Sequence, residues 1–253
     1  MADERAARLA DAVRAAGSVV ALTGAGISAA SGVPTFRGAD GVWGDEFDPE
    51  DFHVDRFRRD PAGFWRDRID LHDALFGDDP APNAAHRALA RLERAGRLDA
   101  VLTQNTDGLH AAAGSERVIE LHGSADRVVC PACGTRRDAA PVRDRAAGDL
   151  PPRCSCGAAL KPDVVLFGEA LPRDRLAEAR RLARESDLLL VVGSSLAVEP
   201  AASLPRTAAR SGRLAVVNLE PTDVDGLAAV VVRRDATAVL PALADAVAPA
   251  DGA

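Results

Sequence analysis

The chain has 253 residues, of which 47% are hydrophobic, and a formal net charge of −7. This length and composition allow one large hydrophobic core, or one core with a small added module. The negative charge argues against a broad electrostatic footprint for nucleic acid, so we expect no nucleic-acid partner.

The sequence also argues against a membrane protein and against disulfide bonds. No apolar run approaches the ~20 residues that a membrane-spanning helix needs, so we expect no membrane partner. Residues 1–17 form an amphipathic helical pattern without the apolar core of a signal peptide. We therefore expect a cytoplasmic protein. In that reducing compartment, four cysteines indicate metal binding or catalysis rather than disulfides.

Strand-like apolar runs alternate with helix-like stretches along most of the chain. The apolar runs cover residues 18–24, 99–105, 117–123, 163–168, 187–195, 213–220 and 228–234, and the helix-like stretches cover 84–95, 174–185, 200–210 and 236–247. Strands that are apolar on both faces, with helices between them, are typical of a parallel sheet covered on both sides. The sequence therefore predicts an α/β fold with a doubly wound, Rossmann-like parallel sheet.

Two segments interrupt this alternation. Residues 39–83 are rich in Asp, Phe, Trp, His and Pro and contain no clear strand, so we interpret them as short helices and loops that cover the ligand edge of the sheet. Residues 128–160 contain all four cysteines, and we interpret them as a separate small module.

The first strand leads into a glycine loop in "LTGAGISAASGVPTFRG", residues 22–38. Gly24 and Gly26 would let the backbone approach a phosphate and expose its N–H groups. A tight turn that requires positive φ would explain the same glycines. Arg37 favours the first interpretation, because a guanidinium near such a loop suits a phosphate or a carboxylate. Alone, this loop indicates nucleotide binding and no particular reaction.

The four cysteines occur as two closely spaced pairs, "CPAC" and "CSC". Paired thiolates on two turns are the ligands of tetrahedral zinc, and four of them leave no open position for catalysis. We therefore predict a structural zinc in a ribbon-like module. A redox dithiol and a DNA-binding ribbon are less favoured alternatives. The predicted ligands are Cys130, Cys133, Cys154 and Cys156.

Polar residues follow several predicted strands, at the edge where open α/β sheets bind ligands. Gln104, Asn105 and Asp107 lie in "TQNTDGLH" and either cap the next helix or bind a ribose and a carboxamide. His122 ends another strand and is a candidate general base. We expect the other histidines to be structural. Two later strand ends contribute Gly193, Ser194, Ser195, Asn218 and Glu220.

Several stretches together resemble the sirtuin family of NAD-dependent protein lysine deacylases. They are "GAGISAASGVPTFRG", "TQNTDGLH", "ELHGS", the cysteine quartet, "KPDVVLFGEALP", "VVGSSLAVEPAASLP" and "VNLEP", in the family's order over residues 24–221. The resemblance implies that NAD is a consumed co-substrate and that acyl-lysine proteins or peptides are the partners. The products would be deacylated lysine, nicotinamide and O-acyl-ADP-ribose, and each chain would hold one structural zinc.

The resemblance also implies roles for individual residues. His122 would be the general base, while Asn105 and Asp107 would hold the nicotinamide ribose and the carboxamide. The substrate peptide would add as a strand beside Val164, Leu166, Phe167 and Gly168. The NAD contacts would be Gly24, Ala25, Gly26, Ile27, Phe36, Arg37, Gln104, Asn105, Asp107, Gly193, Ser194, Ser195, Asn218, Leu219 and Ala236.

The chain departs from the family where acyl groups are selected. Members that prefer malonyl or succinyl lysine carry a Tyr-x-x-Arg pair, whereas this chain has no tyrosine and offers Trp65 and Arg68. We expect Trp65 to form an apolar wall of the acyl site. Arg68 would pair with a distal carboxylate, or point to solvent when the acyl group is acetyl. Deacetylation should therefore exceed desuccinylation. Thr106 stands where the family often has Ile, which would change the packing around the carboxamide.

The predicted NAD-binding domain comprises residues 1–38, 84–127 and 161–253, with 39–83 as a helical lid and 128–160 as the zinc module. Two other functions remain open. A Rossmann-type oxidoreductase explains the sheet and the glycines but not the zinc module, and it would release no nicotinamide. A non-catalytic scaffold that binds NAD or acyl-lysine would have no need of His122.

Overall fold

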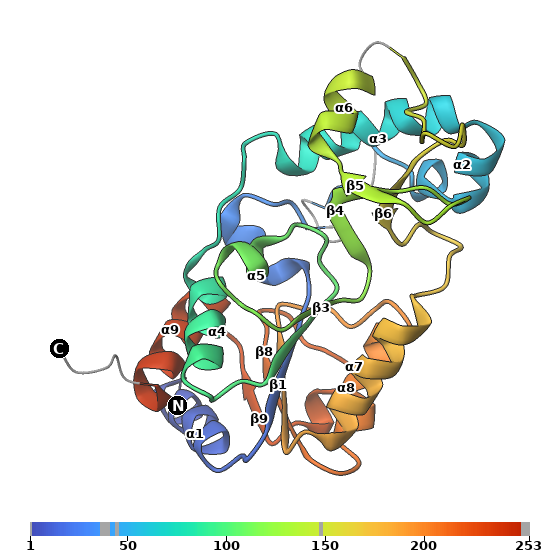
Figure 1. Ribbon diagram of the computed structural model, residues 1–253. Helices are drawn as coiled ribbons and strands as arrows, with labels where there is room; N and C mark the ends of the chain where they lie inside the picture. Colours follow the sequence, from blue (N-terminus) through green and yellow to red (C-terminus); the bar gives the residue numbers. More distant parts are fainter. Residues whose placement is uncertain (1, 36–40, 44–45, 147–148, 249–253) are drawn as a thin grey trace.

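The computed structural model describes residues 2–35, 41–43, 46–146 and 149–248 (Figure 1). Its larger sheet has six parallel strands in the order β3-β2-β1-β7-β8-β9. The chain therefore adds strands on one side of β1 and then on the other, which is the Rossmann order. The strands are β1 (Val19–Thr23), β2 (Ala100–Thr103), β3 (Val118–Glu120), β7 (Leu188–Val192), β8 (Arg213–Val217) and β9 (Val230–Val232).

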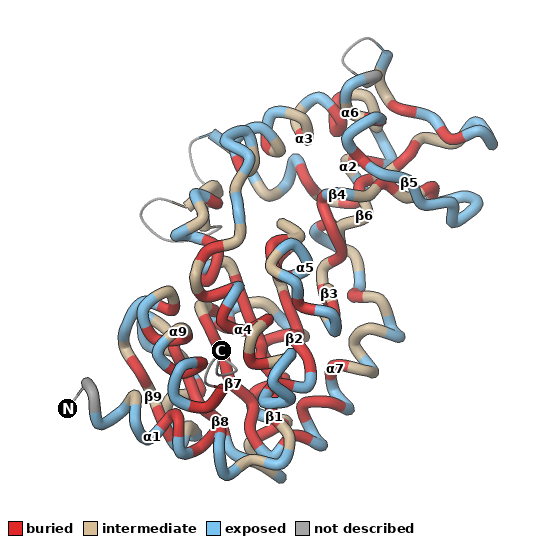
Figure 2. Tube along the Cα trace, turned by 60° about the vertical axis from the view of Figure 1, so that its left-hand side comes forward, coloured by how far each residue is buried: buried red, intermediate tan, exposed pale blue. Residues whose placement is uncertain are grey.

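Helices cover both faces of this sheet, as the sequence predicted. Alternate residues of a strand point to opposite faces: Val19 and Ala21 of β1 join one hydrophobic cluster, and Val20 and Leu22 join another. The first cluster includes α1 (Ala2–Arg14), α4 (Ala84–Arg94) and α9 (Ala236–Val247); the second includes α7 (Arg173–Glu185) and α8 (Leu204–Ala208). Figure 2 shows buried residues running along these strands.

Short helices connect several strands of the larger sheet. They are η1 (Ala25–Ile27), η2 (Ala29–Ser31), α5 (Leu109–Ala112), η4 (Ala201–Ser203) and η5 (Asp225–Leu227). In the described part of the chain, no helix is long and apolar enough to cross a membrane.

A smaller domain is built on a second sheet of three antiparallel strands in the order β5-β4-β6. Phe64, Trp65 and Leu71 of one helix pack with Val128 and Leu160 in a third hydrophobic cluster. The elements are η3 (Pro49–Phe52), α2 (Val54–Arg59), α3 (Pro61–Phe76), β4 (Gly123–Val129), β5 (Arg136–Asp138), α6 (Ala140–Ala146) and β6 (Lys161–Val164). The predicted lid and the predicted zinc module therefore share one core instead of forming two separate units.

The apolar run at residues 163–168 is not a strand of the larger sheet. Its first residues end β6, which pairs with β4 in the smaller sheet, and residues 165–168 follow as an irregular segment. An apolar run shows that a segment is buried, but it does not identify the strand with which that segment pairs. The larger sheet consequently has one strand fewer than predicted.

Candidate functional site

The glycine loop after β1 packs against the loop after β7, at the point where the strand order reverses. The Gly26 N–H donates to the Gly193 carbonyl at 2.8 Å. A Cβ atom on Gly24 or Gly26 would lie within 3.0 Å of atoms in residues 193 and 194, and one on Gly193, whose φ is +57°, would lie 2.3 Å from the Ile27 nitrogen. Glycine is therefore required here for contact between the two loops, whatever ligand they bind.

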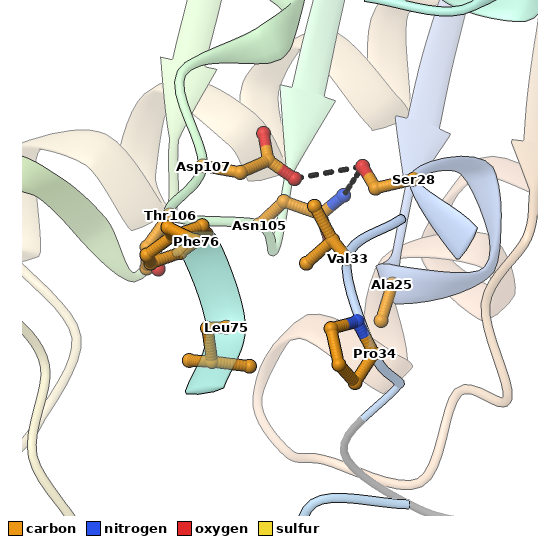
Figure 3. Close-up of a pocket in the computed structure, with 9 residues that line it drawn as sticks. All are labelled: Ala25, Ser28, Val33, Pro34, Leu75, Phe76, Asn105, Thr106 and Asp107. Atoms are coloured by element: carbon orange, nitrogen blue, oxygen red, sulfur yellow. Dashed lines mark hydrogen bonds between the residues drawn. The ribbon is translucent and has the colours of Figure 1, made fainter. Parts of the chain in front are cut away.

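Polar side chains from the end of β2 meet this loop. Asn105 donates from Nδ2 to the Ser28 hydroxyl at 3.0 Å and to the Gly24 carbonyl at 3.2 Å, and the Ser28 hydroxyl donates to Asp107 at 2.7 Å (Figure 3). Gln104 donates from Nε2 to the Ser194 hydroxyl at 2.8 Å, so three strand ends are linked. Ser28 connects Asn105 and Asp107, two of the three predicted catalytic side chains.

A pocket that opens to solvent lies beside this network, with about 260 Å³ of empty space when the open solvent at its mouth is included. Asn105, Thr106 and Asp107 line one side of it, and Leu75 and Phe76 at the end of α3 line another (Figure 3). The remaining lining residues are Ala25, Ser28, Val33 and Pro34. Sequence reasoning missed Leu75 and Phe76, because only the folding of the small domain brings the end of α3 to this pocket.

His122 lies between the two sheets, between β3 and β4, with its ring oriented for use as a base. Its Nδ1 lies 3.0 Å from the Gln104 carbonyl oxygen. A carbonyl only accepts, so Nδ1 carries the proton and Nε2 keeps its lone pair in the neutral ring. Burial lowers the pKa of His122, while its bond to Gln104 acts in the opposite direction. The imidazole is therefore neutral at neutral pH and able to accept a proton.

His86 and His110, which we expected to be structural, contact residues at the end of β1 and in the glycine loop. His86 Nδ1 accepts from the Asn83 N–H at 3.3 Å, which leaves Nε2–H to donate to the Ser28 hydroxyl, also at 3.3 Å. His110 Nε2 lies 2.9 Å from the Thr23 hydroxyl. Burial lowers the pKa of His86 to about 4 and that of His110 to about 3. Both rings are neutral in the folded protein at neutral pH.

We predict that these two histidines make the folded state less stable in mild acid. Above pH ~6.5 they are neutral in both folded and unfolded chains; below it, only the unfolded chain takes up their protons until the pH approaches the folded pKa values. Each should therefore remove about 2 kcal/mol of unfolding free energy between pH 7.5 and pH 5. Urea unfolding over that range measures the loss, and His110→Gln should make the slope shallower. An unchanged slope in this variant would contradict the prediction.

Other predicted NAD contacts follow β7 and β8 or begin α9. Ser195 is exposed after β7, and Asn218 donates from Nδ2 to the Glu220 carbonyl at 2.8 Å. Leu219 is 63% exposed, which is unusual for a large apolar side chain, and Ala236 is buried in the first cluster at the start of α9. Their contacts with NAD stay predictions. Phe36 and Arg37 lie outside the described residues.

The predicted peptide-binding segment lies next to His122. The Val165 N–H donates to the His122 carbonyl at 2.8 Å, Leu166 is buried in the third cluster, and Phe167 is 40% exposed. Within this segment, the Leu166 N–H donates to Glu169, and the Phe167 carbonyl accepts from Val54. The Val164 carbonyl accepts from Lys161, and the Leu166 carbonyl accepts from the Glu169 N–H. An added strand would pair with backbone groups of residues 164–168 that these contacts leave available.

The structure places Trp65 and Arg68, the predicted acyl contacts, on the face of α3 that packs toward β4. Trp65 is 2% exposed, and its indole N–H donates to the Leu160 carbonyl at 2.7 Å, so it is part of the small-domain core. Arg68 is only 8% exposed and therefore does not point to solvent. Both line a second cavity, which shares no lining residue with the pocket beside Asp107. The shared core turns this face of α3 toward β4, and a contact of these two residues with an acyl group stays a prediction.

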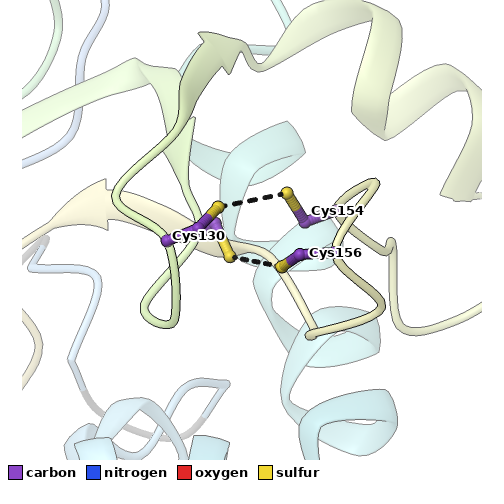
Figure 4. Close-up of side chains that lie close together, drawn as sticks. Cys130, Cys154 and Cys156 are labelled. Carbon is purple, nitrogen blue, oxygen red and sulfur yellow. Dashed lines mark hydrogen bonds between the residues drawn. The ribbon is translucent and has the colours of Figure 1, made fainter.

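The four cysteines meet as predicted (Figure 4). Their sulfur atoms lie within 4.8 Å of one another, with Cys130 and Cys156 at 3.5 Å and Cys133 and Cys154 at 3.7 Å. Tetrahedral zinc with Zn–S bonds of ~2.3 Å needs sulfur atoms about 3.8 Å apart, so this cluster fits the ion. Two turns bring the thiols together, one after β4 and one before β6.

Comparison with known proteins identifies the family. The model of the Sir2 family matches residues 24–200. An NAD-dependent protein deacetylase of Haloarcula marismortui is 59% identical over 94% of this chain and 92% of its own length, and an NAD-dependent protein deacylase 2 of Archaeoglobus fulgidus is 47% identical over 90% of each.

Solved structures of Sir2 proteins have the same fold. One with a p53 peptide and NAD+ has a TM-score of 0.85 at 36% identity and covers 94% of this chain and 96% of its own. Another, with a deacetylated p53 peptide and 3′-O-acetyl ADP ribose, has a TM-score of 0.87 at 36% identity and covers 94% and 97%. The chain belongs to the Sir2 family, the sirtuins, as its sequence motifs indicated.

Proposed function

We propose that this protein removes acetyl groups, and to a lesser extent other acyl groups, from lysine side chains of proteins while consuming NAD. The observation that carries the proposal is the convergence of Asn105, Asp107 and His122 at the carboxyl ends of neighbouring parallel strands, beside a pocket and next to the glycine loop. Two relatives of high sequence identity are named as an NAD-dependent protein deacetylase and an NAD-dependent protein deacylase.

The side chains provide what this reaction needs. NAD supplies a ribose carbon from which nicotinamide departs, and the acyl oxygen attacks that carbon. Asn105 and Asp107 would hold the nicotinamide end, since their amide and carboxylate groups face the pocket. His122 would take a proton from a ribose hydroxyl at Nε2, while Nδ1–H remains bonded to Gln104. Gln104 and Ser194, already linked, would contact the ribose and phosphates.

The cysteine quartet would hold one zinc ion with a structural role. Four thiolates fill a tetrahedral site, so the ion would order the small domain and would not act on the substrate. The protein's other partners would be acyl-lysine peptides beside residues 164–168. A cytoplasmic location and the absence of nucleic-acid and membrane partners stay predictions.

The test is to incubate the protein with NAD and a panel of acyl-lysine peptides and to follow the products by mass. Nicotinamide, free lysine peptide and an ADP-ribose carrying the acyl group should appear in equal amounts, with acetyl the preferred group. An oxidoreductase would convert NAD to NADH and release no nicotinamide, and a binding scaffold would give no product. Either result would refute the proposal.

We predict that Asp107→Asn weakens inhibition by nicotinamide and its exchange into NAD by about tenfold or more. The two Asp107 oxygens accept hydrogen bonds from the Ser28 hydroxyl and the Leu109 N–H, at 2.7 and 2.9 Å. An asparagine turns one of these positions into a donor and disturbs the carboxamide pocket. Inhibition curves and exchange of labelled nicotinamide measure the effect. If both stayed at wild-type values, the role given to Asp107 would be wrong.

A further inference from the structure

A second cavity lies within the small domain, and three arginines line it. It contains about 230 Å³ of empty space, partly open to solvent, between α3, β4 and α6. Its basic residues are Arg68 and His72 on α3, Arg127 on β4 and Arg143 on α6, and Trp65 forms an apolar wall. Figures 1 and 2 both place α6 beside α3 at this end of the molecule.

No carboxylate among the described residues forms an ion pair with Arg68. The side chain is 8% exposed, yet among the described residues it forms no ion pair and donates no hydrogen bond. Burial and the nearby Arg143 lower its pKa to about 10, so the guanidinium is still charged at neutral pH. Buried charges in proteins are normally paired, because removal from water is costly.

The neighbouring groups do not supply the missing negative charge. Arg127 is paired with Glu120 and Asp163, so those two carboxylates are already used. Arg143 donates to the Ala125 carbonyl at 3.3 Å and feels the field of Asp126, but within the described part of the chain it forms no ion pair. Burial, followed by Arg143 and Arg68, lowers the pKa of His72 to about 4, so this ring is neutral at neutral pH. Two guanidinium groups therefore share one cavity without a carboxylate partner among the residues that the structure describes.

We propose that this cavity binds a small oxyanion, with Arg68 as its principal ligand and Arg143 as the second. A planar guanidinium presents paired N–H donors that match two oxygens of a phosphate or a carboxylate, which favours an oxyanion over a halide. The neutral ring of His72 can donate one further hydrogen bond. The site is separate from the NAD pocket but adjoins it, since the Ala125 N–H donates to the carbonyl of Thr106 at 2.9 Å.

The test is to titrate the 253-residue protein with inorganic phosphate and to measure its melting temperature at each phosphate concentration. Saturating ADP-ribose occupies the NAD phosphate positions, and a bulky sulfonate salt keeps the ionic strength constant. The wild-type melting temperature should rise along a saturating curve, by about 3–6 °C at ten times the Kd. A general salt effect would instead continue to rise without saturation.

Two variants and one control locate the binding. Arg68→Met should lose the saturating rise, and in buffer without phosphate it should melt no lower than wild type, because an unpaired buried charge has been removed. Arg143→Gln should weaken phosphate binding by about tenfold or more. Arg59→Met removes an exposed arginine from α2 and should behave as wild type.

The same titration with chloride and with succinate identifies the kind of anion. Phosphate or succinate should bind at least about tenfold more tightly than chloride. Tighter chloride binding would overturn the oxyanion assignment. A saturating rise that persists in Arg68→Met, or calorimetry that finds no phosphate binding to the wild-type protein, would overturn the site itself. Calorimetry with Arg143→Gln remains decisive if Arg68→Met does not fold.

Discussion

His122→Ala should lower the rate of deacetylation by a factor of about 10²–10⁴ and leave NAD binding nearly unchanged. The imidazole holds its proton at Nδ1 against the Gln104 carbonyl, and its pKa is lowered by burial, so its Nε2 can accept a proton at neutral pH. Alanine removes that acceptor. The loops after β1 and β7, which we propose bind NAD, contact each other through their own backbones and do not depend on this ring.

The measurement separates loss of the base from loss of the fold. Steady-state rates with an acetyl-lysine peptide give the catalytic effect, and calorimetry with NAD gives the affinity. The unfolding midpoint should move little, since among the described residues the ring makes one hydrogen bond, to a backbone oxygen. Activity within tenfold of wild type would show that another group acts as the base. Loss of NAD affinity in parallel with activity would assign His122 to binding instead of catalysis.

The sequence predicted the larger domain well, because its signals are local. Val19 to Leu22 are apolar on both faces, and such strands with helices between them leave a doubly wound sheet as the consistent arrangement. The carboxyl ends of parallel strands share one edge, so Asn105, Asp107 and His122 were expected to converge. The spacing of the four cysteines predicted in the same way that their thiols meet, because two short turns are enough to bring four sulfur atoms together.

The small domain was harder to predict, because its core joins segments far apart in the chain. Nothing in residues 61–76 indicates that Trp65 packs against Leu160, or that Arg68 faces a cavity while Leu75 reaches the pocket beside Asp107. These three side-chain positions depend on how α3 is rotated against β4. The irregular segment after β6 was mistaken for a strand of the large sheet for the same reason: the sequence shows burial but not the partner.

Cys154→Ser should abolish zinc binding and unfold the small domain while the six-stranded sheet remains folded. Structural zinc contributes an apparent ~10–16 kcal/mol to small zinc domains, as much as the whole stability of many domains. Cys154 is also buried in the third cluster, together with Trp65 and Leu71 of α3. Loss of the ion should therefore release α3, and with it Leu75 and Phe76 at the pocket, so deacetylation is lost although no catalytic side chain has changed.

The two tryptophans of the chain make this loss measurable. Trp43 and Trp65 both belong to the small-domain cluster, so their fluorescence reports on this domain, while circular dichroism should retain most of the signal of the large sheet. Ser155→Ala is the matched control, because Ser155 lies between two of the cysteines and is exposed. It should keep one zinc per chain and full activity. Wild-type protein without zinc, or a Trp65 that stays protected in Cys154→Ser, would show that the thiols hold the domain together by packing alone.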